Sequence, residues 1–421
     1  MNVIIKPTHL SGNVIIPPSK SLSHRAIIAA SLADGKSIIS NVMLSKDIIA
    51  TIEACRAIGA IIEVDKDKLY IEGSKIKRKS NFINANESGS TIRFMIPIAL
   101  VNSEEMEFRG ENNLVNRPLD SYFEIFDSIG IKYERSTSAY LPLKTLGGLI
   151  PTTYNIRGDI SSQFITGLLF SLPLLNGDSK IVITTKLESK GYVDLTLDIL
   201  SKFGIEIVNV NYEEFIIKGN QKYHPYDYSI EGDYSQTAFF LVADALGANI
   251  NLIGMNEFSY QGDKKIIDDM KKFNSQIYFN DSGLRCSTEK LIGTTIDFSQ
   301  SPDLGPALTV LACLAEGCSN FINAGRLRIK ECDRIACMRE ELNKMGANIR
   351  ELPEGMIING VDNLVGTTVD SHNDHRVAMA LAMASLKTKG EIKILNAECV
   401  SKSYPNFWEV FKSLGGEFSY E

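Results

Sequence analysis

The chain has few of the residues from which metal and redox sites are built. Its 421 residues include five His, one Trp and seven Cys, and the Cys residues form no CxxC pair. No HxH, HExxH or clustered Cys/His pattern occurs, which argues against the common zinc motifs. An odd number of scattered Cys predicts reduced, buried thiols rather than a disulfide framework. The sequence therefore points to neither a catalytic metal nor a disulfide-stapled fold.

Long apolar runs and basic tracts are absent as well. The longest apolar runs lie around Gly167–Leu175 and Val377–Leu386, well short of the roughly 20 residues that span a bilayer. The first residues lack the basic segment and apolar core of a secretory signal. The 44 Lys and Arg against 51 Asp and Glu leave a formal charge of −7, which disfavours binding to nucleic acid or anionic membrane. We therefore predict a cytoplasmic globular protein whose partners are small molecules, with no nucleic acid and no membrane.

A repeat of about seventy residues organises the chain. An amphipathic helix, a Gly or Asn, and a segment with the pattern of a β-strand recur six times. The Gly or Asn residues serve as anchors of the repeat, and the spacings between successive anchors are 71, 74, 70, 72 and 69 positions. Gly or Asn just after an apolar helix is the left-handed cap from which the chain reverses into a strand. The six anchors are Gly59, Gly130, Gly204, Asn274, Gly346 and Gly415.

Each repeat reads as strand, helix, strand, helix and a final pair of strands. A second alignment supports the period, since Tyr154–Leu169 and Tyr228–Ala243 share a strand, a Gly-Asp turn and a Ser/Gln-led helix. Seventy residues make too small a core for six separate domains. Three repeats closing around shared helices would form one domain, so we predict an α/β chain of two pseudo-symmetric lobes, divided near Gly232.

Polar, basic or glycine residues stand where the first helix of each repeat begins. Helix N-termini present free N–H groups and partial positive charge, so they suit anions, although Ser or Asp there is often only a cap worth about 1 kcal/mol. Basic residues in a first turn oppose the helix dipole, and a negatively charged ligand would compensate them. The candidates are Lys20, Ser21, Arg25, Gly89, Arg93, Ser161, Ser162, Gln163, Ser235, Gln236, Asp303, Asp374, His375 and Arg376.

Further basic residues lie on connecting segments. Lys330 and Arg334 are four residues apart in KECDR, so a helix there would place both on one face with Glu331 adjacent. In isolation such a segment is more typical of a solvated, salt-bridged helix than of a binding site. The other basic candidates on these segments are Arg117, Arg326, Arg328 and Lys402.

Nine short phrases, in family order, resemble those of the enolpyruvyl transferases, in particular the branch that acts on shikimate 3-phosphate. They are PPSKSLSHR, SGSTIRF, NRPLD, SSQF, SKGYVD, SPD, RIKECDR, NDHR and SKSYP, from residue 17 to residue 405. The resemblance implies an α/β (α+β) fold of two lobes, each of three βαβαββ repeat units, of the inside-out α/β barrel type. Residues 1–18 with 232–421 would form one lobe and residues 19–231 the other, with the active site in the cleft between them.

The resemblance also implies an activity and the residues that perform it. Members of that branch transfer the enolpyruvyl group of phosphoenolpyruvate to the 5-hydroxyl of shikimate 3-phosphate, releasing phosphate, in the shikimate pathway to chorismate and aromatic amino acids. They need no metal or organic cofactor, and a monomer is expected. Residues expected at shikimate 3-phosphate are Lys20, Ser21, Arg25, Ser161, Ser162, Gln163, Ser189, Asp303 and Lys330. Residues expected at phosphoenolpyruvate are Lys20, Gly89, Arg117, Gln163, Arg334, Arg376 and Lys402.

The expected catalytic residues are two carboxyl groups and a lysine. Asp303 resembles the family's proton acceptor and Glu331 its proton donor, and an acid that works near neutral pH needs a raised pKa. Lys20 is the third catalytic candidate, and Lys20 and Lys402 are both candidates for the later elimination step. Arginine forks suit the carboxylate and phosphate oxygens of the two substrates.

Two positions depart from the family pattern. Arg326 stands where some members have an Asn that contacts the shikimate phosphate, so that contact is open. Glu87 replaces a residue that is often Asn, and it either points away from the Gly89 turn or pairs with a nearby Arg.

Three alternatives remain beside this reading. The sibling enzyme that acts on UDP-N-acetylglucosamine carries a Cys in the loop before its Arg-Pro segment, and Val101–Pro118 contains none. A non-catalytic anion-binding protein on the same fold would be expected to lack Asp303 or Glu331, yet both are present. An RNA-end cyclase built from related repeats is disfavoured by the acidic charge.

Overall fold

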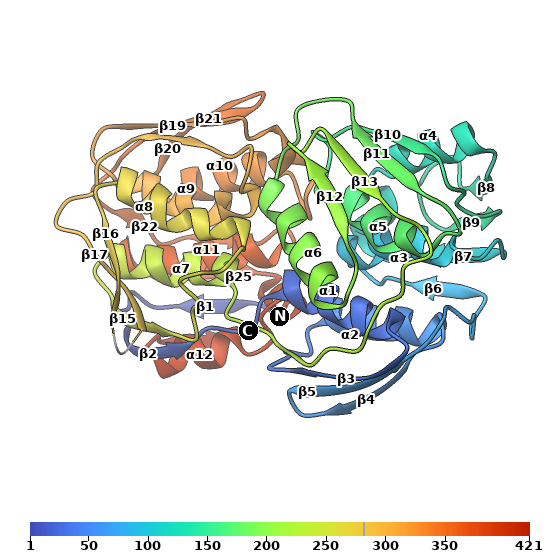
Figure 1. Ribbon diagram of the computed structural model, residues 1–421. Helices are drawn as coiled ribbons and strands as arrows, with labels where there is room; N and C mark the ends of the chain where they lie inside the picture. Colours follow the sequence, from blue (N-terminus) through green and yellow to red (C-terminus); the bar gives the residue numbers. More distant parts are fainter. Residues whose placement is uncertain (281–282) are drawn as a thin grey trace. The chain divides into compact units, whose positions relative to one another are not determined.

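The computed structural model describes residues 1–280 and 283–421, and the chain divides into two compact units (Figure 1). Unit 1 consists of Met1–Ser19 and Glu231–Glu421, and unit 2 consists of Lys20–Ile230. The chain thus passes between the units twice, and each passage lies one residue from the boundary expected from the resemblance.

Within the described residues, six four-stranded sheets, three in each unit, repeat one pattern of strand pairing. In each sheet two strands run parallel, and a third strand pairs antiparallel with both the second and the fourth. A parallel pair needs a crossover, which a helix provides, whereas the antiparallel pair needs only a tight turn. The βαβαββ unit predicted from the period is therefore confirmed.

Unit 2 contains the first three repeats. The first consists of β14 (Tyr228–Ser229), α1 (Lys20–Leu32), β3 (Gly35–Ser40), α2 (Lys46–Ala57), β4 (Ile61–Asp65) and β5 (Lys68–Gly73). The second consists of β6 (Phe82–Asn84), α3 (Gly89–Ala99), β7 (Met106–Arg109), η1 (Asn112–Asn116), α4 (Asp120–Ile129), β8 (Lys132–Arg135) and β9 (Leu143–Leu146). The third consists of β10 (Thr153–Ile156), α5 (Ser162–Ser171), η2 (Leu172–Leu174), β11 (Ser179–Ile183), α6 (Lys190–Lys202), β12 (Ile207–Val210) and β13 (Glu214–Ile217).

Unit 1 contains the other three. The fourth repeat consists of β2 (Ser11–Ile15), α7 (Tyr234–Ala245), β15 (Asn249–Ile253), η3 (Gly262–Lys265), α8 (Ile266–Lys272), β16 (Gln276–Asn280) and β17 (Gly283–Ser287). The fifth consists of β18 (Thr295–Asp297), η4 (Pro302–Leu304), α9 (Gly305–Cys313), β19 (Cys318–Ile322), η5 (Gly325–Ile329), α10 (Arg334–Lys344), β20 (Asn348–Leu352) and β21 (Gly355–Asn359). The sixth consists of β23 (Thr368–Asp370), α11 (His375–Ala384), η6 (Ser385–Lys387), β25 (Ile392–Leu395), η7 (Ala397–Lys402), α12 (Phe407–Ser413), β26 (Phe418–Tyr420) and β1 (Val3–Ile5), beside a short pair β22 (Leu364–Val365) and β24 (Thr388–Lys389).

Each predicted turn after a second helix has the expected left-handed backbone. The φ angles at the six anchors are 119° at Gly59, 75° at Gly130, 80° at Gly204, 67° at Asn274, 86° at Gly346 and 100° at Gly415. Glycine adopts this conformation without the clash of a Cβ atom, and Asn tolerates it better than most residues. The spacing of these residues therefore marks the six helix-to-strand reversals correctly.

The first helix of each repeat lies inside its unit. In unit 1, every residue of α7, α9 and α11 is buried, and these three helices contact one another. Their sequences are rich in small apolar residues on all sides, as in GPALTVLAC and HRVAMALAMA, which is the pattern of a fully buried helix. In unit 2, α3 and α5 pack together in the same way. The polar residues before these helices are thus held by a rigid interior.

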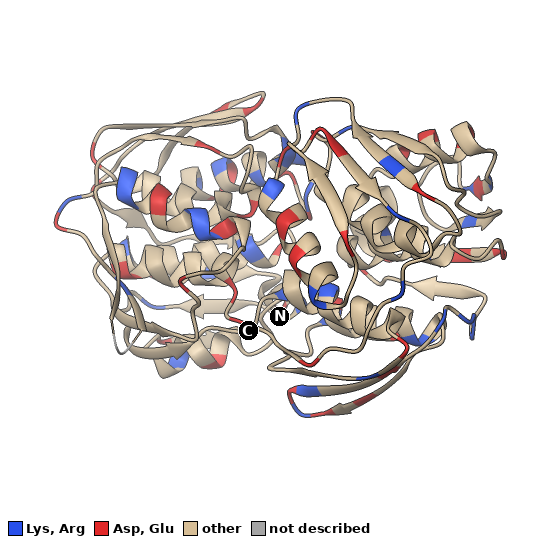
Figure 2. Ribbon diagram, viewed as in Figure 1, with Lys and Arg blue, Asp and Glu red and all other residues tan. Residues whose placement is uncertain are grey.

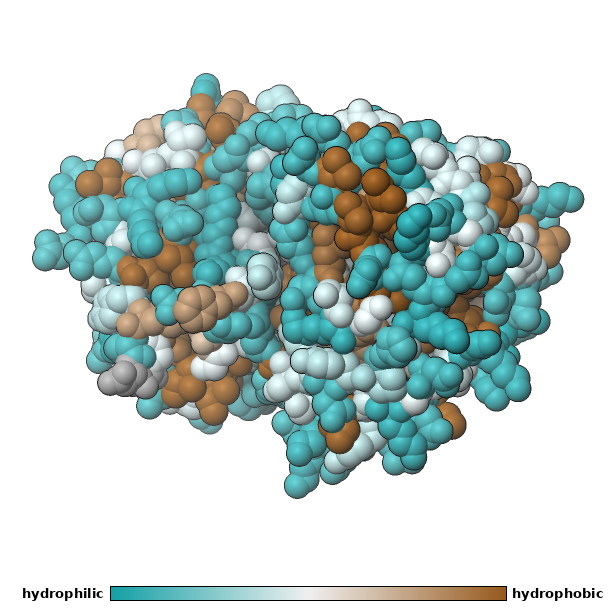
Figure 3. All heavy atoms as spheres, in the orientation of Figure 1, coloured by the Kyte–Doolittle hydropathy of each residue, from teal (hydrophilic) through white to brown (hydrophobic). Residues whose placement is uncertain are grey.

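Basic and acidic residues are both distributed along the chain of each unit (Figure 2). Hydrophilic residues cover most of the face in Figure 3, with apolar patches between them. Within residues 1–280 and 283–421, no helix has both the length and the apolar character needed to cross a membrane.

Candidate active site

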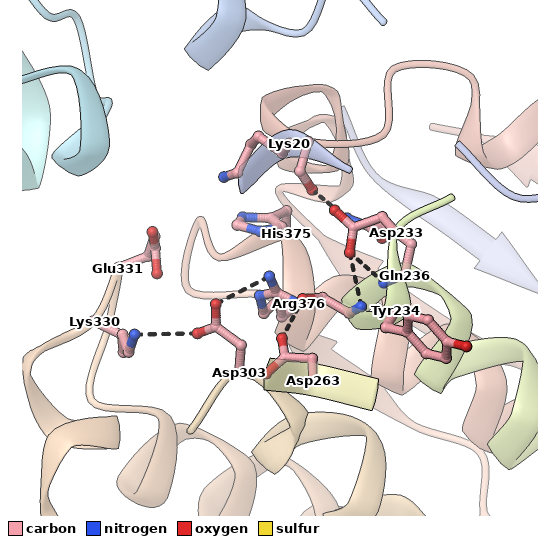
Figure 4. Close-up of polar contacts among 12 residues, drawn as sticks. Lys20, Asp233, Tyr234, Gln236, Asp263, Asp303, Lys330, Glu331, His375 and Arg376 are labelled. Carbon is pink, nitrogen blue, oxygen red and sulfur yellow. Dashed lines mark hydrogen bonds and ion pairs between the residues drawn. The ribbon is translucent and has the colours of Figure 1, made fainter. Parts of the chain in front are cut away.

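In unit 1, three cations meet at the carboxylate of Asp303, in η4 just before α9. Lys330 Nζ lies 3.2 Å from Oδ1, Arg334 Nη1 donates to Oδ1 at 2.9 Å, and Arg376 Nη2 donates to Oδ2 at 3.1 Å. Figure 4 shows the carboxylate between Lys330 and Arg376. Burial raises the pKa of Asp303, but the three cations outweigh burial and hold it well below its usual range. Asp303 is therefore ionised at neutral pH.

Arg334 is the centre of this cluster because its guanidinium reaches three carboxylates. Besides Asp303, Nη2 donates to Glu331 Oε2 at 2.7 Å and Nε donates to Asp374 Oδ2 at 2.8 Å. The Arg334 side chain is 1% exposed and that of Asp374 is fully buried. Burial lowers the pKa of Arg334, but the three acids together raise it well above its usual value. Arg334 is thus permanently charged and held in one orientation.

Asp374 also shapes the start of α11. Its Oδ1 accepts the backbone N–H of Arg376 at 2.8 Å and so caps the helix. One carboxylate therefore fixes both Arg334 and the helix turn that carries Arg376. This explains how two basic residues share a buried region: the acid that caps the helix also offsets their charge.

The segment before α10 differs from the sequence-based expectation. Lys330 and Glu331 do not lie on a helix, because α10 begins at Arg334, where Asp333 Oδ1 accepts the backbone N–H of Ala336 at 3.1 Å. Asp333 is a strong N-cap, and an N-cap starts the helix after itself. Lys330 and Arg334 nevertheless both reach Asp303, through an irregular turn instead of a helix face. Burial lowers the pKa of Lys330 to about 8, although Asp303 favours its charge.

In unit 2, Lys20 is the first residue of α1 and pairs with Asp47. Nζ lies 2.8 Å from Oδ2, and both side chains are largely buried. Arg25 lies in the second turn of α1 rather than the first, and donates to Thr196 Oγ1 at 2.9 Å and to the carbonyls of Ser21 and Tyr192 at 2.8 and 3.0 Å. These contacts fix the guanidinium of Arg25, and burial lowers its pKa to about 10.

Gln163, in the first turn of α5, is held from two sides. Its Oε1 accepts from Arg93 Nη1 at 2.7 Å, and its Nε2 donates to Ser90 Oγ at 2.9 Å. Arg93 itself sits in the second turn of α3, not the first, with its guanidinium 4.9 Å from the ring centre of Phe164. The amide of Gln163 therefore has one orientation, which Arg93 imposes.

Gly89 begins α3, as predicted, and lies against the guanidinium of Arg117. A Cβ atom at this position would come within 2.6 Å of Arg117 Nη1 and 2.9 Å of its Cζ. The absence of a side chain thus lets Arg117 approach the helix N-terminus closely. Glu87, one of the two departures, accepts a hydrogen bond from Asn112 Nδ2 at 2.8 Å.

The remaining candidates occupy helix starts and turns. Ser161 caps α5, with Oγ accepting from the N–H of Gln163 at 3.3 Å, and Ser162 is its first residue. Ser189 directly precedes α6 and has φ 54°. Lys402 ends η7 and is 7% exposed. Arg326 donates to the carbonyl of Ser299 at 3.5 Å.

Sequence reasoning missed two partners of the cationic residues. Asp47 was not singled out, since an acidic residue in the first turn of α2 is typical of any helix. Asp374 was placed at a helix start but given no role toward Arg334. No local pattern could have revealed either pair, because the partners are 27 and 40 residues apart in the chain.

Comparisons with known proteins agree on one family. A family model described as EPSP synthase (3-phosphoshikimate 1-carboxyvinyltransferase) matches residues 4–411. A 3-phosphoshikimate 1-carboxyvinyltransferase of Clostridium perfringens strain 13 is 54% identical, with 98% of each chain covered. One of Clostridioides difficile strain 630 is 50% identical, with 98% of this chain and 97% of the relative covered. The solved structure of an EPSP synthase from Acinetobacter baumannii matches with a TM-score of 0.83 at 25% identity over the full length of both chains. The chain belongs to the EPSP synthase family, a branch of the enolpyruvyl transferases.

Proposed function

We propose that the protein transfers the enolpyruvyl group of phosphoenolpyruvate to the 5-hydroxyl of shikimate 3-phosphate and releases phosphate. Family membership supports this reaction. The observation that carries it in the structure is the Asp303 cluster, where Lys330, Arg334 and Arg376 converge on one ionised carboxylate. The reaction needs such a combination, because it brings together anionic substrates and a base.

The cationic residues bind the phosphate and carboxylate groups of the two substrates in this proposal. The guanidinium groups of Arg25, Arg117, Arg334 and Arg376 suit planar or tetrahedral oxygen groups, which accept two parallel hydrogen bonds. Residues that contact shikimate 3-phosphate are Lys20, Ser21, Arg25, Ser161, Ser162, Gln163, Ser189, Asp303 and Lys330. Residues that contact phosphoenolpyruvate are Lys20, Gly89, Arg117, Gln163, Arg334, Arg376 and Lys402. The residues assigned to the two substrates thus come from both units.

Asp303 acts as the proton acceptor for the 5-hydroxyl. Its three cationic neighbours make it a weak base, since they hold its pKa well below the usual range. Anionic substrates compete with Asp303 for Lys330, Arg334 and Arg376. As substrate oxygens take up the positive charge of these cations, the negative charge of Asp303 loses part of its compensation and its affinity for a proton rises. Substrate binding itself therefore activates the base.

Glu331 acts as the proton donor to the methylene carbon of phosphoenolpyruvate. It lies next to Lys330 in the chain, and its Oε2 accepts from Arg334 Nη2 at 2.7 Å. Glu331 must be protonated before it can donate a proton. Arg334 therefore has to release Glu331 and bind the carboxylate of the substrate instead. Lys20, paired with Asp47 at 2.8 Å, is the third catalytic residue and a candidate for the elimination step, as is Lys402.

The proposal requires neither a metal nor an organic cofactor, and it places the enzyme in the cytoplasm as a monomer. The described cysteines are all free thiols, as expected for that compartment. Chelator-treated protein should therefore retain its activity, and light scattering at working concentration should give the mass of one chain.

The test is phosphate release from phosphoenolpyruvate with either of two acceptors. Shikimate 3-phosphate should support release together with a product that carries the enolpyruvyl group, detected by mass spectrometry. Asp303→Asn should lower turnover by about 100-fold or more, as expected for loss of a general base. Asp362→Asn, at an exposed carboxylate of the same unit, is the matched control and should not. Release only with UDP-N-acetylglucosamine, or with neither acceptor, would refute the proposal.

A further inference from the structure

The fully buried carboxylate of Glu341, in α10, joins this helix to the turn that precedes α11. Its Oε2 accepts the backbone N–H of Asp370, the last residue of β23, at 3.0 Å. Its Oε1 lies 2.7 Å from Nε2 of His372, two residues further along the turn. From within α10, Lys344 Nζ donates to both oxygens at 2.9 Å. The carboxylate of Glu341 therefore has partners both in its own helix and in the turn.

The backbone of this turn needs support from its neighbours. His372 and Asn373 follow one another with left-handed φ angles of 50° and 56°. Residues with a Cβ atom adopt this conformation at a cost, which His and Asn bear better than most. The Asp370 carboxylate accepts the N–H of His372 at 2.8 Å. Ser371 Oγ accepts the N–H of Asn373 at 3.2 Å. Glu341 holds the N–H of Asp370 and so fixes the residue at which these contacts begin.

The same turn leads into two residues beside Asp303. Its last residue, Asp374, holds Arg334 and caps the helix that carries Arg376. Arg376 in turn reaches the Asp303 carboxylate at 3.1 Å (Figure 4). Arg334 and Glu341 are seven residues apart in α10, so they lie on one face of that helix. Helix α10 thus holds the turn at both ends, through Glu341 at its start and Arg334 at its end.

We propose that Glu341 is a positioning residue for phosphoenolpyruvate binding. It holds the start of the turn, and the turn sets where Asp374 and Arg376 lie. Arg376, and Arg334 on the other side of Asp374, are both assigned to phosphoenolpyruvate. The effect on this substrate therefore rests on the proposed function, whereas the hold of Glu341 on the turn does not.

An amide at this position cannot make the same contacts as the carboxylate. Both oxygens of Glu341 accept from Lys344, so the NH2 group of a Gln meets a donor in either orientation. In one of the two orientations it also faces the N–H of Asp370. Glu341→Gln keeps the size of the side chain and should loosen the turn.

Hydrogen exchange, followed by mass spectrometry, tests the hold on the turn without any substrate. In Glu341→Gln the amides of Asp370 and His372 should exchange about tenfold faster than in the wild type, because this segment opens more easily. Asp269→Asn is the matched control, since Asp269 is a fully buried carboxylate of the same unit that accepts from two lysines at 2.6 and 3.0 Å. It should leave exchange at residues 370–376 as in the wild type. Unchanged exchange in Glu341→Gln, or equal acceleration in the control, overturns the proposal.

Steady-state kinetics tests the effect on the site. In Glu341→Gln the KM for phosphoenolpyruvate should rise about tenfold, because a displacement of ~1 Å at a positioned group can cost on the order of 100-fold. The KM for shikimate 3-phosphate should change by less than about twofold, since the turn carries no residue assigned to that substrate. A loss of stability alone lowers the amount of active protein and does not separate the two KM values. No rise, or an equal rise for both substrates, overturns the proposal.

A second variant keeps the test open if Glu341→Gln does not fold. His372→Asn removes the ring that faces Glu341, and Asn accepts the left-handed backbone as His does. The KM for phosphoenolpyruvate should rise about threefold in this variant, and an unchanged value overturns the proposal. If the wild-type protein shows no transferase activity, the proposed function fails by itself, and hydrogen exchange still decides whether Glu341 holds the turn.

Discussion

The carboxylate of Asp374 holds the guanidinium of Arg334 by two atoms, with Nε donating to Oδ2 at 2.8 Å and Nη2 to Oδ1 at 3.3 Å. Neither side chain is more than 1% exposed. A buried ion pair in this geometry contributes orientation more than stability, because both charges have lost their hydration. Its value to the site is that Arg334 faces Asp303 and Glu331 in one fixed direction.

Replacing Asp374 by Asn tests this orientation. Asn is as good an N-cap as Asp, so α11 should begin at the same residue while Arg334 loses a charged partner. We expect the free energy of unfolding to fall by about 3 kcal/mol, as for a buried ion pair that loses one partner, and turnover to fall with it. Asp333→Asn is the control, since Asp333 caps α10 at a more exposed position. Equal losses in both variants, measured by urea unfolding, would contradict the role of Asp374.

Replacing Gly89 by Ala tests the close approach of Arg117. The new Cβ would lie 2.6 Å from Arg117 Nη1, so the guanidinium has to move. Because α3 begins here without a left-handed φ, we expect the free energy of unfolding to change by less than about 1 kcal/mol. The KM for phosphoenolpyruvate should rise several-fold. In the control Gly325→Ala, the nearest atom is Glu354 Cγ at 3.5 Å, an ordinary contact, and KM should stay unchanged.

The pKa of Lys330, lowered by burial to about 8, predicts a pH dependence of substrate binding. Lys330 carries a charge below this pH and loses it above. The dissociation constant for shikimate 3-phosphate should therefore rise about tenfold between pH ~7 and ~9, following the deprotonated fraction. Calorimetric titration measures this directly. Lys330→Arg should flatten the curve, because Arg stays charged, and an unchanged curve in the variant would assign the effect to another group.

The depressed pKa of Asp303 predicts how acid affects stability. A carboxylate whose pKa is lower in the folded state stabilises the protein above its unfolded pKa, and this contribution is lost as pH falls through the folded value. The unfolded value is near 3.8. Asp303→Asn should therefore lower the free energy of unfolding by about 1–3 kcal/mol. This difference between wild type and variant should stay the same from pH ~8 to ~5. The difference between wild type and variant should shrink only below pH ~4, and shrinkage above pH ~5 would contradict the low pKa.

His24, within unit 2, predicts a loss of stability in the same direction, beginning at a higher pH than that of Asp303. It is fully buried on α1, its Nδ1 lies 2.6 Å from Thr51 Oγ1, and burial lowers its pKa to about 3. The unfolded chain takes up this proton near pH 6.5 and the folded chain does not, so stability falls as pH decreases below 6.5. Between pH 7 and 5 this contribution should amount to about 2 kcal/mol. It should be missing in His24→Leu, as urea unfolding at both values would show, whereas an equal slope in the two proteins would exclude it.

Much of the fold could be predicted because its signals are local. The six left-handed caps, from Gly59 to Gly415, mark helix ends through the conformational freedom of a single residue. The strands that complete the sheets could not be assigned in this way. β14 pairs with β3, almost 190 residues earlier, and β1 pairs with both β25 and β26 at the other end of the chain. Such pairings join strands that are far apart in the sequence, so the residues of a short segment do not reveal them.

The candidate site, like the fold, could be predicted only in part from the sequence. The sequence alone established which kinds of side chain precede the buried helices, since caps and helix starts follow from neighbouring residues and their hydrogen bonds. Their partners and charge states were set by the tertiary structure. Asp303 meets Lys330, Arg334 and Arg376, which come from two other segments, and this meeting makes its carboxylate a weak base. The physical reason is that electrostatic interaction and desolvation depend on distance and burial in the folded chain, which separation along the sequence does not express.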